Sequence, residues 1–148
     1  MNFEETVRAL ADRAAIQDLL QRYAHGVDRR DIDLVASCFA PDATYKGALG
    51  EGPIGAALEA LRERMMRYES TMHFIGNQLV DIQGDRARSE TYAIAYHQLV
   101  EEGSYRQMVV GVRYIDRLER REGRWLICDR VVVLEWQRYD NVDLPEGS

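Results

Sequence analysis

The chain has 148 residues, of which 46% are hydrophobic and 30% are charged, and its formal net charge is −6. This length and balance are typical of one globular domain rather than of a disordered chain. The acidic charge argues against a general nucleic-acid or anionic-membrane partner, and the longest apolar run, residues 92–96, is too short to cross a membrane as a helix. Because no signal peptide precedes the first helical pattern, we expect a cytoplasmic protein.

The first 30 residues predict a helix. Asp31 is a suitable N-cap for a short second helix, Ile32–Cys38, and Gly26 weakens the end of the first. The evidence for the first helix is a set of apolar residues that recur at intervals of three and four: Ile16, Leu19, Leu20, Tyr23 and Val27.

A break in the helical pattern is expected at residues 39–42, followed by a brief strand, Ala43–Lys46. Glycines at positions 47, 50 and 52 then predict a flexible loop. A third helix is expected to start at Pro53, because proline suits the first helical position. Its apolar stripe continues as far as Tyr68.

After Ser70 the pattern changes to β-branched and aromatic residues, which predicts four strands joined by short turns at 84–85, 102–103 and 122–123. Strands joined in this way are antiparallel. The order of elements predicts an α+β fold with helices on one face of a curved antiparallel sheet. We expect one domain over residues 1–140 and a loose tail over residues 141–148. The predicted strands are Met72–Ile82, Arg86–Val100, Tyr105–Arg120 and Arg124–Trp136.

Cofactor and metal motifs are missing. The two cysteines, Cys38 and Cys128, lie among apolar neighbours and belong to no CxxC pair, so free buried thiols are expected. The chain has no phosphate loop, GxGxxG, HExxH or GxSxG, which argues against nucleotide enzymes, zinc proteases and serine hydrolases. We therefore expect no cofactor and no metal.

His73 is the first candidate for chemistry. It opens a predicted strand and shares one face of it with Ile75, Asn77 and Leu79. A neutral imidazole is the usual general base at neutral pH, so His73 could remove a proton from a substrate. The structural alternative is a histidine that is hydrogen-bonded within the core.

Asp28 is the second candidate, at the end of the first helix and at the edge of the stripe that carries Tyr23 and Val27. A carboxylate in such a place could orient a histidine and stabilise its protonated form. The alternative is an exposed aspartate in the polar run 28–31.

Arg130 is the third candidate, in an apolar strand where Leu126, Cys128 and Val132 fall on its face. An unpaired buried charge is costly, so a guanidinium inside a sheet needs a partner. That partner could be Asp28, Glu135 or a substrate anion, unless this face of the sheet is exposed.

Three further residues are candidates for contact with a substrate. His97 shares its strand face with two alanines, whose small size leaves room for a ligand, while Tyr96 faces the other way. Tyr23 and Tyr45 could donate hydrogen bonds from their hydroxyls, or could be core aromatics with solvated tips. His25 is expected at the surface.

Six segments of the chain form a recognisable set of motifs: 13–23, 27–31, 39–43, His73-Phe-Ile-Gly-Asn77, Gly84-Asp85-Arg-Ala87 and 114–125. Through them, residues 8 to 136 resemble the SnoaL-like branch of the nuclear-transport-factor-2-like superfamily. The likeness implies a cone-shaped curved sheet that, with about three N-terminal helices, encloses a deep pocket. It also implies a homodimer or a homotrimer.

This branch includes scytalone dehydratase, a hexachlorocyclohexane dehydrochlorinase and a bile-acid 7α-dehydratase, which are cofactor-independent lyases that use a histidine base oriented by an aspartate of the first helix. Asp28 and His73 stand at the matching positions, and Arg130 matches a strand arginine of that group. His97 is a candidate for the second histidine of the scytalone-type enzymes. The residue set of ketosteroid isomerases has no clear match.

Two functions therefore follow from the sequence. The first is a dehydratase-like lyase or an isomerase that acts on a small apolar cyclic or polyketide-like molecule, with His73 as base, Asp28 as its partner, and Arg130 with Tyr23 or Tyr45 stabilising developing negative charge. The second is a non-catalytic binding or accessory oligomerisation domain, because the fold alone does not imply catalysis. Contact between His73 and Asp28 inside an enclosed pocket would favour the first.

Overall fold

The computed structural model describes residues 1–143 and contains three helices and six strands in that range. The predicted α+β class is confirmed. Strand β6 runs through Asn141, where the tail was expected to start, and residues 144–148 lie outside the described residues. The elements in chain order are α1 (Phe3–Asp28), α2 (Ile32–Ser37), β1 (Phe39–Gly47), β2 (Gly50–Pro53), α3 (Ile54–Met65), β3 (Ser70–Gln83), β4 (Arg86–Glu101), β5 (Ser104–Arg121) and β6 (Arg124–Asn141).

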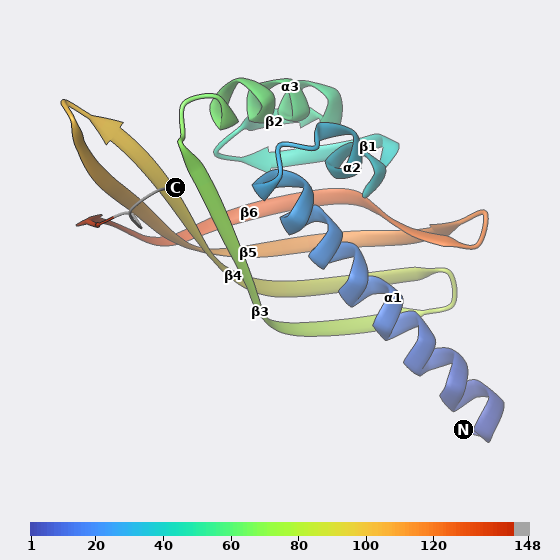
Figure 1. Ribbon diagram of the computed structural model, residues 1–148. Coiled ribbons are helices and arrows are strands. Elements are labelled where there is room, and N and C mark those ends of the chain that lie inside the picture. The colour runs from blue at the N-terminus through green and yellow to red at the C-terminus, as the bar shows by residue number, and fades with distance from the viewer. Residues whose placement is uncertain (144–148) are drawn as a thin grey trace.

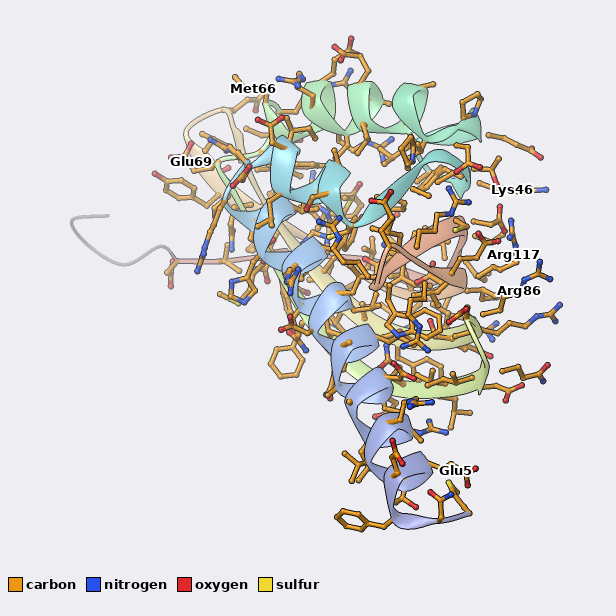
Figure 2. All side chains as sticks on the ribbon, turned by 90° about the vertical axis from the view of Figure 1, so that its right-hand side faces the viewer. Glu5, Lys46, Met66, Glu69, Arg86 and Arg117 are labelled. Carbon is orange, nitrogen blue, oxygen red and sulfur yellow. The ribbon has the colours of Figure 1, made fainter. Side chains whose placement is uncertain are left out.

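The strands form a single curved and unclosed sheet in the order β2-β1-β6-β5-β4-β3. Helix α1 crosses one face of it, and the Ser70 end of β3 and the hairpin between β4 and β5 bend towards α3 (Figure 1). Charged side chains such as Lys46, Arg86 and Arg117 point away from the body of the molecule (Figure 2). The curvature and the helices thus create an inner face, which side chains from both can line.

Helix α1 is capped and buried as its sequence predicts. Asn2 and Glu5 form a capping box at its start, and every residue of the predicted apolar stripe is buried. Asp31 caps α2 through a bond from the Leu34 backbone N–H, as expected. Gly26 has a packing role, because a Cβ there would lie 2.8 Å from Cγ2 of Val35 on α2.

The stretch between α2 and α3 differs from the prediction. Residues 39–42 already belong to β1, and a register shift between Phe39 and Thr44 absorbs the proline. The expected glycine loop contains β2, which pairs with β1 as a hairpin, and Pro53 is the N-cap of α3 rather than its first residue. Strand β1 also runs parallel to β6, so the sheet is mostly rather than wholly antiparallel. The pairing of β1 with β6 joins segments about 85 residues apart, which local patterns do not report.

A bulge in β3 corrects the predicted face of that strand. Residues 76 and 77 together stand opposite Tyr92, between the pairs Ile75–Ala93 and Gln78–Thr91. His73 and Ile75 therefore keep the inner face, but Asn77 and Leu79 are exposed. Beyond the bulge it is Val80 and Ile82 that pack against the core.

The core fills the space between α1 and the inner face of the sheet. Cys38 and Cys128 lie in it as free buried thiols, as expected. No helix within residues 1–143 has both the length and the apolar character needed to cross a membrane.

Candidate active site

A cavity of about 460 Å³ lies between the end of α1, α3 and the inner face of the sheet. Its volume falls in the range of about 300–1,000 Å³ that is usual for small-molecule sites. The lining is mainly apolar, with His73, His97 and several tyrosines among the polar residues. Apolar members of the lining include Leu49, Leu61, Met65, Val110, Val132 and Leu134.

Asp28 and His73 meet at this cavity. Oδ1 of Asp28 lies 2.7 Å from Nδ1 of His73, and the His73 side chain is only 8% exposed. The same carboxylate accepts a bond from the His73 backbone N–H at Oδ2 and one from the Thr71 hydroxyl at Oδ1. The last residue of α1 is thereby attached to the first residues of β3, and the imidazole orientation is set from two sides.

The ionisation of Asp28 follows from these bonds. Partial burial by itself raises the pKa of the carboxyl, but the hydrogen bonds from His73 and Thr71 outweigh it and lower the pKa below its ordinary value. An ionised carboxylate only accepts hydrogen bonds, so Nδ1 of His73 carries a proton. In the neutral ring Nε2 then holds the free lone pair, and the ring forms part of the cavity lining.

His97 lies beside His73, with the two ring centroids 5.9 Å apart and nearly perpendicular planes. It lines the cavity, as its predicted strand face implied. Its Nδ1 lies 3.3 Å from the Met108 carbonyl oxygen, and its ring packs at 4.8 Å against Tyr68, which the sequence analysis did not single out as a site residue. Burial, and next the charge of His73, lower the pKa of His97 to about 4, so this ring is neutral at neutral pH.

Tyr23 and Tyr45 also line the cavity, where the sequence analysis expected substrate contacts. Both are almost completely buried, at 7% and 6% exposure. Burial raises the pKa of Tyr45 to about 12 and raises that of Tyr23 as well, although the nearby Arg130 opposes the rise at Tyr23. Both hydroxyls are therefore protonated at neutral pH and can donate hydrogen bonds.

Arg130 has a different partner from those predicted. Its Nε and Nη2 donate to the two carboxylate oxygens of Asp116, each at 2.7 Å, and both side chains are fully buried. The guanidinium also lies over the rings of Tyr114 and Tyr23, at 4.3 and 4.4 Å from their centroids. Burial alone disfavours the charged form, but Asp116 overcomes it and raises the pKa of Arg130. Arg130 thus lies behind two cavity tyrosines rather than in the lining itself.

A bulge explains why Asp116 was missed. The turn at 122–123 pairs Arg121 with Arg124, and continuing that register would place Asp116 opposite Asp129. A shift between Arg117 and Leu118 adds one residue to β6, so Asp116 faces Arg130 instead. Ile127 takes the place of Leu126 on the arginine's face, because it pairs with Leu118. In the sequence, Asp116 stands two residues from both Tyr114 and Leu118, which are apolar and buried. An acid on the same strand face as two core residues was the signal that could have identified Asp116.

Two larger hollows lie elsewhere, and the first, of about 670 Å³, is on the outer face of the sheet among Phe74, Tyr92 and Trp136. Its charged residues, Arg113 and Glu135, pair with each other, so neither is free to act as an acid or a base. The second, of about 790 Å³, has no histidine in its lining. Residues 1–143 hold no group of three or more His, Cys, Asp or Glu placed to bind a metal ion. The smaller inner cavity is therefore the candidate active site.

The curved sheet, the three helices and the inner cavity define a nuclear-transport-factor-2-like fold. Within that class the chain belongs to the SnoaL-like domain family, whose pattern it matches over residues 8–131.

Two curated relatives are similar in sequence. An uncharacterised protein of Mycobacterium tuberculosis is 30% identical over 130 residues, which cover 85% of this chain and 87% of the relative. Hexachlorocyclohexane dehydrochlorinase 1 of Sphingobium indicum is 32% identical over 120 residues, covering 78% of this chain and 77% of the enzyme.

Solved structures agree with the fold. A type 2 hexachlorocyclohexane dehydrochlorinase superimposes with a TM-score of 0.83 at 25% identity, over 97% of this chain and 99% of that one. A putative scytalone dehydratase from Novosphingobium aromaticivorans gives a TM-score of 0.80 at 18% identity, over 97% of this chain and 98% of that one. At 18% identity, this second likeness concerns the fold alone.

Proposed function

We propose that the inner cavity is the active site of a cofactor-independent lyase, in which His73 removes a carbon-bound proton from a small, largely apolar molecule. The observation that carries the proposal is the 2.7 Å contact between Asp28 and His73, whose imidazole lines the cavity. A histidine that needed only a structural partner would not also require an adjoining cavity of about 460 Å³. The expected homodimer or homotrimer stays a prediction.

The course of the elimination follows from the protonation state of Asp28 and His73, which together form the dyad. Nε2 of His73 takes the proton, the electron pair of the C–H bond forms a C=C double bond, and the leaving group departs with its own bonding pair. Asp28 stabilises the imidazolium that results and keeps the ring in the required tautomer. A halide leaves as an anion, whereas a hydroxide takes the proton back from His73. Return of the proton to another carbon would make the same dyad an isomerase.

Negative charge that develops on the substrate would meet the hydroxyls of Tyr23 and Tyr45, both protonated at neutral pH. Behind Tyr23 the guanidinium of Arg130 is held by Asp116 and cannot turn into the cavity without losing that pair. We therefore assign Arg130 a fixed electrostatic contribution rather than direct contact with the substrate.

One relative supports an elimination. It is hexachlorocyclohexane dehydrochlorinase 1, a lyase type by name and 32% identical to this chain. A lyase is favoured over a non-catalytic binding domain because the base in the cavity lining is hydrogen-bonded to a carboxylate that can orient it.

The test is loss of elimination in His73→Ala, with His25→Ala as the control because His25 is exposed and does not line the cavity. Wild-type protein is assayed with hexachlorocyclohexane, scytalone and a panel of cyclic ketones and polyketide-like alcohols. For each compound that reacts, kcat should fall by about 10²–10⁴ in His73→Ala and remain unchanged in the control. Full activity of His73→Ala, or binding without turnover across the panel, would refute the lyase.

A further inference from the structure

The charges around the cavity differ in sign from those of the chain as a whole. The protein carries a net charge of −6, yet the cavity lining contains Arg64 and Arg67 and neither an aspartate nor a glutamate. Asp28, the acid of the dyad, accepts hydrogen bonds from Thr71 and His73 with its two oxygens. A ligand in this cavity therefore meets uncompensated positive charge.

Arg64 is the better placed of the two arginines, because it is half-buried whereas Arg67 is exposed. Arg64 lies in the last turn of α3, whereas Arg67 follows the helix, in the corner whose ends are marked by Met66 and Glu69 in Figure 2. Nη2 of Arg64 donates to the Ala48 carbonyl oxygen at 3.0 Å, and the side chain forms no ion pair within residues 1–143. The carbonyl oxygen accepts a hydrogen bond from one guanidinium nitrogen, but it provides no counter-charge for Arg64.

A neighbouring arginine shows that this arrangement is not simply the usual preference for basic residues in the last turn of a helix. Arg62 occupies the same turn of α3, but it is exposed and pairs with Glu59 at 3.7 Å. A cation near a helix C-terminus is favourable wherever its side chain points. Of these two arginines, only Arg64 lines the cavity.

The field of Arg64 reaches the reacting end of the cavity. Its charge contributes, after burial and His73, to the lowered pKa of His97, and it also opposes the raised pKa of Tyr45. His97 itself is neutral at neutral pH, so the positive charge on this side of the cavity comes from the arginine.

We propose that Arg64 forms an anion subsite that binds the carboxylate of a largely apolar substrate while the reacting carbon of that substrate lies against His73. This inference rests on the proposed lyase and adds the class of substrate, a carboxylic acid. A carboxylate fits better than a phosphate, because its single charge is balanced by one guanidinium and the rest of the lining is mainly apolar.

The experiment compares two unreactive probes of the same shape, 2-naphthoate and 2-naphthamide, by isothermal titration calorimetry at low ionic strength. The wild-type protein should bind the carboxylate about tenfold more tightly than the amide, as expected for one charge-assisted contact. Arg64→Gln should remove this preference, Arg64→Lys should retain part of it, and Arg62→Gln should leave it intact. Added salt should reduce it, because Arg64 is only half-buried.

The location of the probes is read from the imidazole NMR signals of His73 and His97, which should shift with both compounds, and the backbone spectrum reports whether each variant is folded. Equal affinity for the two probes, absence of naphthoate binding, unchanged histidine signals, or a preference that survives Arg64→Gln would each overturn the subsite. His73→Ala should keep the carboxylate preference while losing elimination, so a failure of the lyase and a failure of the subsite give different results.

Discussion

Two acid–base pairs lie beside the inner cavity, one partly exposed and one fully buried, and they differ in their access to it. Asp28 and His73 form the first, with the imidazole in the lining and the carboxylate side chain 23% exposed. Asp116 and Arg130 form the second, with no exposed surface on either side chain. The first can exchange a proton with a bound molecule, whereas the second can supply only a constant charge distribution. Proximity of opposite charges alone therefore does not identify a catalytic pair.

The largest expected effect comes from removing one member of the fully buried pair Asp116–Arg130, called the sealed pair below. Asp116→Ala leaves the Arg130 guanidinium buried without a counter-charge, which should lower the free energy of unfolding by about 3–5 kcal/mol, measured by urea denaturation. The control is Arg113→Gln on the outer face, where a 34% exposed guanidinium pairs with Glu90 and Glu135. That change should cost no more than about 1 kcal/mol. Equal losses in the two variants would contradict a structural role specific to the sealed pair.

Removing the carboxylate charge of the accessible pair, Asp28 and His73, should mainly affect catalysis. Asp28→Asn no longer holds the His73 tautomer or stabilises the imidazolium, so kcat should fall by about 10²–10³, equivalent to about 3–4 kcal/mol of activation free energy. Thr71→Val is the matched control, since it removes another bond to the same carboxylate and leaves the His73 contact. If steady-state kinetics show the same loss of kcat in both variants, the orienting role of Asp28 is wrong.

A smaller effect is expected from His97 as the pH is lowered. In the unfolded chain His97 is protonated below its ordinary pKa near 6.5, whereas in the folded protein the pKa is about 4. Protons therefore bind the unfolded chain more tightly in this window, and the free energy of unfolding should fall by about 2–3 kcal/mol between pH 7 and pH 4.

The contribution of His97 is isolated by comparing wild type with His97→Gln in urea denaturation across that pH range. The variant should lose part of the pH dependence, while His25→Gln, which changes an exposed histidine, should follow the wild type. Identical slopes for wild type and His97→Gln would show that His97 is not held neutral by the fold.

Some of the site could be predicted from local patterns and some could not. The strand faces of His73 and His97 followed from simple alternation, because no bulge separates His73 from Ile75 or His97 from the two alanines on its face. Beyond Ile75 the bulge in β3 makes the predicted face of that strand wrong. The partner of Arg130 did not follow, because the extra residue in β6 near Cys128 changes which residue it opposes. A register shift costs little locally and is decided by how distant side chains pack, so no pattern within one strand reports it.

By itself the sequence determined the order of three helices and four long strands, the cap at Asp31 and the buried stripe of α1, since each depends on residues a few positions apart. The likeness of its motifs to the SnoaL-like family also indicated that Asp28 and His73 belong together. Only the tertiary structure decided that β1 lies parallel to β6, that Asp116 rather than Asp28 neutralises Arg130, and that Arg64 reaches the cavity. These outcomes depend on contacts between segments far apart in the chain, where packing and charge burial set the energy and local periodicity carries no information.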